Sequence, residues 1–301
     1  MSRRIVLSML AIWVLGACSA APAATPDGRL AVVATTTQLG AVASAIGGEE
    51  IALTTLLKPG IEAHDFELSA DAGGRLEQAD LVLLSGAGLE DWLSDAIETI
   101  GVADQVRDMS AGVALREADD GGAPDPHYWL SPEHAAVMVQ NVRDALATAD
   151  PAHAGLFEQR AVELTTRLDA ADAEARALIG EVPVTERKLV TDHDALGYFI
   201  EAYELEFVGS IFPSLDVASE PSARDIERLV DEIRTRGVRA IFSESSVNPA
   251  LAQTIADETE ATLVEEPLYT DSLGPAGSGA DTLEGMLVHN ARVIRDGLLG
   301  G

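Results

Sequence analysis

The sequence predicts an α/β protein with two lobes, each a mainly parallel sheet flanked by helices, joined by one long rigid backbone helix. Short apolar runs alternate with segments of helical spacing before residue 150 and again after residue 182. Such alternation is typical of parallel sheets whose faces are covered by helices. A single apolar seam fills the stretch between the two halves, and a chain of 301 residues is long enough for two cores.

The first residues of the chain are predicted to be an export signal rather than part of the fold. Arg3 and Arg4 precede an apolar stretch over residues 5–16. That stretch is shorter than the ~20 apolar residues that a membrane-spanning helix needs, which favours a signal peptide. We therefore expect the mature protein in the periplasm or on the extracytoplasmic face of the membrane.

The end of this signal resembles a lipobox. In residues 15–18 (LGAC), Cys18 would be lipidated and become the mature N-terminus, and two lipid signals anchor a protein firmly. Residues 21–23 (APA) offer a competing cleavage site after Ala23, which would leave the protein without lipid. We predict a signal peptide over residues 1–18, followed by a tether over residues 19–28 that is rich in Ala and Pro.

Residues 29–149 are expected to form the first lobe. Its strands are runs of aliphatic and β-branched residues, and Gly or Pro residues punctuate the chain between elements. Ser131 followed by Pro132 predicts a helix start, because Ser caps the exposed N–H groups and Pro fits the first turn. The expected strands cover residues 30–35, 51–57 and 81–84, and the expected helices cover residues 38–46, 69–78, 89–100 and 132–147.

Residues 150–181 are expected to form the connecting helix. Its apolar residues lie four, three, four, three and four positions apart, as one face of a helix requires. They are Phe157, Ala161, Leu164, Leu168, Ala171 and Ala175. A helix of roughly 25 residues is ~40 Å long. Because no flexible Gly/Ser linker joins the halves, we expect little relative motion of the lobes.

Residues 182–301 are expected to form the second lobe, in which the alternation restarts after Pro183. The expected strands cover residues 188–191, 207–211, 240–242 and 262–264, and the expected helices cover residues 196–203, 221–236, 249–257 and 282–298. A Gly-rich loop over residues 268–279 separates the last strand from the last helix.

Composition excludes several classes of function. The net charge of −30 disfavours binding to nucleic acids, because few cations are present to neutralise phosphates. Cys18 is the only cysteine, so the mature fold has no disulfide, thiolate zinc site or cysteine nucleophile. A strongly negative chain is soluble and attracts cations, and adaptation to a salty surrounding explains the charge equally well.

Three of the six histidines lie in loops beside turns or strand ends: His64, His127 and His193. A fourth loop of the same character carries Asp271. Loops at strand ends converge in open α/β sheets. Imidazole nitrogens suit borderline metals, and a carboxylate compensates part of the charge. The pattern favours one metal ion bound where four loops meet.

The other three histidines have plainer interpretations. His134 lies in the first turn of a helix and is expected to be exposed, and His153 at the start of the connecting helix is expected to be solvated. His289 in the last helix is expected to be a packed or surface group.

Several acids flank the loop histidines and could orient imidazole N–H groups, or could be solvated loop acids. They are Asp65, Asp125, Asp192 and Asp194. Glu244 ends a strand of the second lobe, where we favour an orienting or capping role and keep it as the reserve fourth ligand.

The chain resembles the zinc/manganese substrate-binding proteins of ABC importers, the cluster A-I or TroA-like family, over nearly all of residues 30–298. The resemblance rests on six motifs in order: Pro59-Gly60 with His64, Gly88-x-Glu90-x-Trp92-Leu93, DPHYWL at 125–130, TDHDALGY at 191–198, FSE at 242–244 and DSLG at 271–274. It implies two α/β lobes joined by a backbone helix, with the metal in the cleft. It also implies delivery to a membrane permease driven by an ATPase.

Carried over by position, the resemblance assigns His64 and His127 from the first lobe, and His193 and Asp271 from the second, as metal ligands. Manganese binders of the family tend to have a carboxylate at the third position, where this chain has His193. Nitrogen-rich four-coordinate sites also favour zinc. We therefore predict Zn(II) as the transported ligand, with Mn(II) as the alternative.

This chain departs from many zinc members in one loop. They carry a long His-rich loop before the Asp-Pro-His motif, whereas residues 117–124 here are short and acidic. An auxiliary metal-scavenging role is therefore in doubt, although the acidic loop could contact a periplasmic zinc chaperone. We expect a monomer whose membrane partner is the permease.

Two other functions compete with metal transport. A metal-dependent hydrolase would use the three loop histidines with Glu244 as general base, but the chain has no His-Glu-x-x-His helix. Four protein ligands would also leave no open position for a reacting water, so we predict no enzymatic activity. A surface adhesin is the third hypothesis, because some members of the family are also described as adhesins.

Overall fold

The computed structural model describes residues 28–64, 66–117, 123–215, 217 and 220–300. The predicted signal peptide, Cys18, almost all of the predicted tether and Asp65 lie outside these residues. Among the residues described, no helix is both long and apolar enough to cross a membrane.

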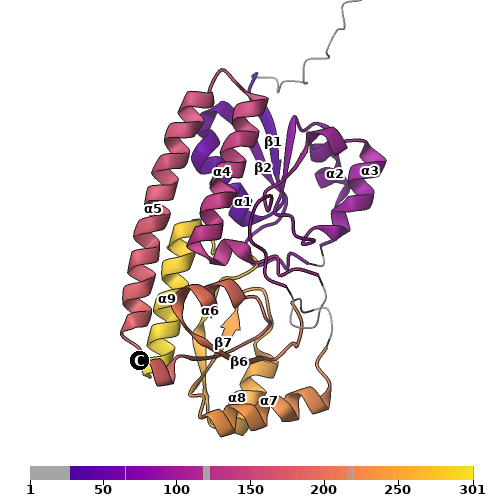
Figure 1. Ribbon diagram of the computed structural model, residues 1–301. Coiled ribbons are helices and arrows are strands. Elements are labelled where there is room, and N and C mark those ends of the chain that lie inside the picture. The colour runs from indigo at the N-terminus through magenta and orange to yellow at the C-terminus, as the bar shows by residue number, and fades with distance from the viewer. Residues whose placement is uncertain (1–27, 65, 118–122, 216, 218–219, 301) are drawn as a thin grey trace, which may run out of the picture.

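Two four-stranded parallel sheets form the cores of two lobes, one above the other in Figure 1. The first sheet has the order β2-β1-β3-β4 and the second the order β6-β5-β7-β8. The strands are β1 (Leu30–Ala34), β2 (Ile51–Thr55), β3 (Leu81–Leu84), β4 (Val106–Asp108), β5 (Lys188–Thr191), β6 (Glu206–Ser210), β7 (Ala240–Glu244) and β8 (Thr262–Leu268). The predicted fold class is confirmed.

Helices flank both sheets. The first lobe contains α1 (Thr37–Gly47), α2 (Ala70–Glu77), α3 (Ser94–Ile100) and α4 (Pro132–Ala149). The second contains α6 (Gly197–Tyr203), α7 (Ala223–Arg236), α8 (Ala250–Thr259) and α9 (Leu283–Leu299). Several starts follow from local chemistry: the hydroxyls of Ser69, Ser222 and Thr282 each accept a bond from a backbone N–H in the first turn.

Two details of the first lobe differ from the prediction. The strand β4 was not expected, because its three residues, Val-Arg-Asp, are partly exposed and have no apolar pattern. The expected helix over residues 89–100 begins with a 3₁₀ turn, Asp91–Leu93, and becomes α-helical only at Ser94. Glu90 precedes that turn and is buried, where its carboxylate accepts hydrogen bonds from Ser85 N, Gly86 N and Thr35 Oγ1.

The connecting helix is α5 (Ala154–Gly180), which runs along both lobes in Figure 1. It packs against α1 and α4 of the first lobe and against α6 and α9 of the second. All six residues of the predicted apolar seam are buried, and Ile179 extends it. One apolar cluster continues from β1 and α1 through α5 to α9, so the two lobes share a packed spine.

The packing of α5 yields a stability prediction. Phe157 is fully buried in the seam, whereas Val162 on the same helix is 54% exposed. We expect Phe157→Ala to lower the free energy of unfolding by about 3–5 kcal/mol and Val162→Ala by less than about 0.5 kcal/mol. Urea unfolding of the metal-free protein, followed by circular dichroism, measures both. Equal shifts would show that α5 is not a core element.

Candidate metal centre

Three loops at the carboxyl ends of strands and the segment that leads into α4 bring His64, His127, His193 and Asp271 to one place between the lobes. His64 follows β2, His193 follows β5 and Asp271 follows β8. His127 lies at the start of a 3₁₀ turn, Tyr128–Leu130, which leads into α4. Because all strands within each sheet are parallel, these loops lie at one edge of their sheet, as the sequence predicts.

The four side chains form a compact set. One candidate ligand atom from each lies within 4.8 Å of those of the other three. The Nε2 atoms of His64 and His127 are 3.1 Å apart, and His127 Nε2 is 3.0 Å from Asp271 Oδ1. His193 Nε2 lies 3.4 Å from Asp271 Oδ2. Ligands bound to zinc at about 2.0–2.1 Å in a tetrahedron are about 3.4 Å apart, so this spacing fits one shared cation.

The ring of His193 supports the same interpretation. It is fully buried, and neither ring nitrogen makes a hydrogen bond of normal geometry, although Glu244 Oε2 lies 2.9 Å from Nδ1. A buried nitrogen without a hydrogen bond is costly unless another partner satisfies it. A cation between His193 and Asp271 would supply that partner.

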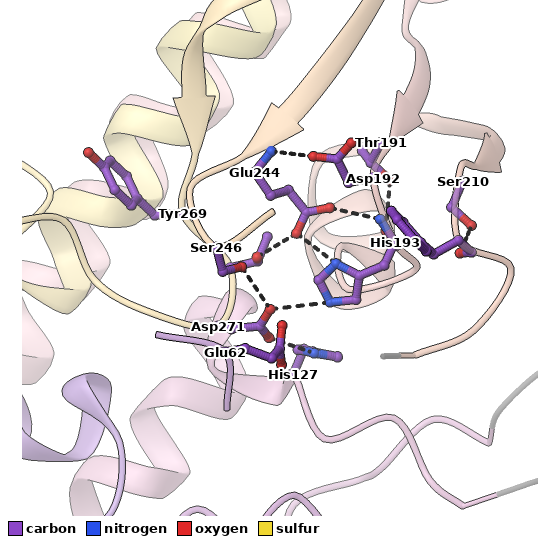
Figure 2. A network of polar contacts seen from close by, with 12 residues as sticks. Glu62, His127, Thr191, Asp192, His193, Ser210, Glu244, Ser246, Tyr269 and Asp271 are labelled. Atoms are coloured by element: carbon purple, nitrogen blue, oxygen red, sulfur yellow. Dashed lines mark hydrogen bonds and ion pairs between the residues drawn. The ribbon is translucent and has the colours of Figure 1, made fainter. Parts of the chain in front are cut away.

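Each buried histidine is backed by a carboxylate of its own lobe. Asp125 Oδ1 accepts from the backbone N–H of His127 and lies 2.8 Å from Nδ1 of the same residue. In the second lobe, Glu244 Oε1 accepts from the backbone N–H of His193, as Figure 2 shows. Such outer carboxylates fix the ring so that Nε2 faces the site. The orienting role predicted for acids next to the histidines therefore falls to Asp125.

The carboxylate of Asp125 is itself held between the lobes. Arg116 Nη1 donates to Asp125 Oδ2 at 3.0 Å, and its guanidinium lies 5.6 Å from the ring centre of Tyr198 on α6. The hydroxyl of Tyr198 donates to the backbone oxygen of Asp125 at 2.8 Å. A side chain at Gly197 would collide with the guanidinium of Arg116, so a larger residue there would push Arg116 away from Asp125.

The electrostatics of the metal-free site favour positive charge at its centre. Burial alone would lower the pKa of His127, but Asp125 and Asp271 outweigh it and raise the pKa to about 9. Burial likewise opposes protonation of His193, yet Glu244 and Asp271 raise its pKa well above the ordinary value. Burial would raise the pKa of Asp271, but His193 and the hydrogen bonds of the neighbouring imidazoles hold it well below its usual range. In the metal-free site, protons on the imidazoles of His127 and His193 therefore supply the positive charge that a bound cation would supply.

The remaining predicted residues lie outside this set of four. Glu244, the reserve ligand, contacts His193 and receives a hydrogen bond of 2.6 Å from Thr270 Oγ1. Asp192 Oδ2 accepts from the backbone N–H of Glu244 at 2.8 Å, so this acid braces Glu244 and not an imidazole. Asp194 N donates to Ser214 O at 3.3 Å.

The other three histidines are elsewhere. His134 is only partly exposed because its ring packs against Tyr198, with centroids 5.2 Å apart. His153 pairs with Asp150 at 2.6 Å near the surface. His289 is a packed group, as one of its two interpretations proposed, and its Nε2 bonds Pro267 O at 2.9 Å.

Comparison with known proteins agrees with this geometry. The family model described as ZnuA, zinc-uptake complex component A, periplasmic, matches residues 32–297. The chain belongs to this family. The ZnuA family consists of metal-binding substrate-binding proteins of ABC transporters, so the predicted resemblance and the predicted absence of enzymatic activity are confirmed. A divalent metal is the bound ligand, and the transporter permease is the partner.

Relatives in the ZnuA family are named for binding different metals. The manganese-binding lipoprotein MntA of Bacillus subtilis is 32% identical over 279 residues, which cover 90% of each chain. The iron-binding protein YfeA of Yersinia pestis is 30% identical over 249 residues, covering 81% of this chain and 78% of that protein. The structure of the periplasmic zinc-binding protein TroA from Treponema pallidum matches with a TM-score of 0.84 and 29% identity, covering 90% of this chain and 99% of that one.

Glu62 is a site residue that sequence reasoning missed. Its Oε1 accepts from His64 N at 2.9 Å, and its Oε2 is buried without a hydrogen-bond partner. Figure 2 places it beside Asp271 and His127. Burial, followed by the charge of Asp271, raises the pKa of Glu62. The signal that could have found it is its position two residues before His64, the same offset as Asp125 before His127.

The raised pKa of His127 predicts a pH dependence of stability in the metal-free protein. A folded-state pKa of about 9, above the ordinary ~6.5, means that the protonated ring stabilises the fold in full below ~6.5. This contribution is lost as the pH rises through about 9. Relative to His127→Gln, we expect the metal-free protein to lose up to about 3 kcal/mol of unfolding free energy between pH 6.5 and 9.

Urea unfolding of both proteins at closely spaced pH values, with a chelator present, measures this loss. Parallel stability profiles for the wild type and His127→Gln would show that the buried ring is neutral throughout.

Proposed function

We propose that this chain captures Zn(II) between its two lobes through His64, His127, His193 and Asp271 and delivers it to the permease of an ABC importer. The observation that carries the proposal is the convergence of these four side chains, with candidate ligand atoms within 4.8 Å of one another. Three of the four are fully buried, and His64 is 14% exposed at the side chain, so the cation would be largely shielded from water.

The donor set supports zinc. Three imidazole nitrogens and one carboxylate leave a net charge of +1 around a divalent ion, and the half-buried Glu62 and the buried Glu244 lie nearby. Nitrogen donors bind zinc more tightly than manganese in the general order of divalent affinities. His193 is the decisive residue, because a carboxylate at this position would make the site richer in oxygen.

Manganese transport is the second candidate, and two observations favour it. The relative that is 32% identical is named for manganese binding. Glu62 also presents a buried oxygen without a hydrogen bond beside Asp271, and carboxylate oxygens suit manganese. A turn of the Glu62 side chain toward the cation would convert the site to three nitrogens and two carboxylates.

Glu244 is proposed as an orienting residue in place of a ligand. Both of its oxygens are engaged, one by the backbone N–H of His193 and the other by Thr270 Oγ1 and the ring of His193. A carboxylate so placed sets the ring direction and raises the basicity of the ligand nitrogen.

The remaining features of the proposal concern location and partners. We propose that residues 1–18 direct export of the chain and that Cys18 anchors it in the membrane. The tether after Cys18 then keeps the folded lobes close to the membrane. We also propose that it acts as a monomer, loaded either directly or by a periplasmic zinc chaperone.

Loss of one ligand tests the site. His127→Ala should lower zinc affinity by more than about 100-fold, since outer-sphere partners alone contribute about 10–100-fold. His153→Ala is the matched control, because that ring pairs with Asp150 near the surface and should leave affinity unchanged. Competition with a chromophoric chelator measures both, and we expect one zinc per chain. Equal losses, or two equally tight zinc ions per chain, would contradict the ligand set.

Exchange of the third ligand tests the choice of metal. His193→Glu should lower the ratio of zinc to manganese affinity by on the order of tenfold, because an oxygen donor replaces a nitrogen. Direct competition between the two ions in the wild type and the variant gives this ratio. If the wild type bound manganese more tightly than zinc, the proposal of zinc transport would be wrong and manganese transport would take its place.

A further inference from the structure

The loop that carries Asp271 belongs to the second lobe in sequence, but most hydrogen bonds of residues 270–273 go to the first lobe. The loop leaves β8 at Leu268. The side-chain amide of Asn290 on α9 accepts from the backbone N–H of Tyr269 and donates to the carbonyl oxygen of Tyr269. From Thr270 onward, the partners change. The hydrogen-bond partners of the loop therefore change from the second lobe to the first between Tyr269 and Thr270.

Two side chains of the first lobe bind the residue before Asp271. The carbonyl oxygen of Thr270 accepts from Gln38 Nε2 at 2.9 Å and from Trp129 Nε1 at 2.9 Å. Gln38 lies in the first turn of α1, and Trp129 lies two residues after His127. Both side chains are fully buried, so the two donors fix this carbonyl from rigid elements.

Two more bonds fasten the loop after Asp271. Leu273 N donates to Thr37 Oγ1 at 2.8 Å, and Gly60 N donates to Ser272 Oγ at 2.9 Å. Together with the two bonds to the Thr270 carbonyl, four hydrogen bonds join residues 270, 272 and 273 to the first lobe. They flank Asp271 on both sides, so its backbone position follows the first lobe.

Contacts of this segment with the second lobe are fewer among the described residues. Thr270 Oγ1 donates to Glu244 Oε2 at 2.6 Å, and Ser246 Oγ lies 3.4 Å from Asp271 Oδ2. Figure 2 shows that the Asp271 carboxylate also faces His193. These polar contacts would break if the second lobe moved away while the four bonds to the first lobe stayed intact.

We propose that Gln38 and Trp129 are positioning residues that hold the Asp271 carboxylate on the first lobe. His64, His127 and Asp271 then form one unit on that lobe, and His193 is the single ligand that the second lobe contributes. When the site opens, the contact between His193 and Asp271 and the hydrogen bond between Thr270 and Glu244 break. This inference rests on the proposed function, because it takes Asp271 to be a ligand.

A double-mutant cycle tests the proposal in the full mature chain, with zinc as the probe. Gln38→Leu combined with Trp129→Phe removes both donors and keeps buried apolar side chains. We expect this pair to lower zinc affinity by about 10–100-fold. In an Asp271→Ala background the same pair should change affinity by less than about twofold, because the ligand that the donors position is gone.

A spectroscopic measurement separates positioning from general damage. The absorption of the Co(II)-loaded Gln38→Leu/Trp129→Phe protein should shift toward that of Asp271→Ala, since both lose the same carboxylate. Gln159→Leu removes an exposed amide that donates to Glu163 on α5 and is the matched control, with a spectrum and an affinity like those of the wild type. If Trp129→Phe prevents folding, Gln38→Leu alone must show the same lack of additivity with Asp271→Ala.

The possible failures are distinguishable. Unchanged zinc affinity in Asp271→Ala would remove Asp271 from the ligand set and refute the proposed function. A large loss in Asp271→Ala, together with an equal effect of the double donor variant in both backgrounds, would leave the ligand set intact and overturn the positioning role. An unchanged affinity in the double donor variant would overturn it as well.

Discussion

The constraint on which the structure depends is a buried carboxylate surrounded by imidazoles. Asp271 is 1% exposed and lies within 3.7 Å of ring nitrogens from three histidines. An isolated carboxylate at this depth would cost several kcal/mol, so it needs positive charge beside it. Residues from both lobes must therefore meet there. The shared apolar spine of α1, α5 and α9 keeps the lobes close enough for this contact.

The two lobes support the site in parallel ways. In the first, Asp125 backs the ring of His127, and in the second, Glu244 backs the ring of His193. Each carboxylate also accepts the backbone N–H of the histidine it orients. The ring of His127 is hydrogen-bonded at its outer nitrogen and has little freedom to turn away, while Glu244 Oε2 lies 2.9 Å from the outer nitrogen of His193. Contacts within each lobe thus set the directions of the His127 and His193 rings, which reduces the ordering cost of binding a cation.

Local sequence patterns predict the scaffold well because they depend on neighbours in the chain. The buried strands are short aliphatic runs, and the seam of α5 is visible from its spacing alone. The loop histidines are found because strand ends converge in parallel sheets. Contacts such as Gln38 with Thr270 join residues 232 positions apart and leave no local pattern. Likewise, β4 has no apolar pattern and is defined by its pairing with β3, and the nearness of Glu62 to Asp271 appears only in the folded chain.

The division of the site between the lobes bears on how metal choice can vary within one fold. In the proposed arrangement, His64, His127 and Asp271 form one unit on the first lobe, so changes among them would disturb the framework. His193 stands apart, since its ring is oriented by Glu244 on the neighbouring strand of its own sheet. A substitution there would alter the donor atom while Asp125, Trp129 and Gln38 keep the rest of the set in place. A substitution at position 193 of the second lobe can thus change the chemistry of the third donor without rebuilding the binding site.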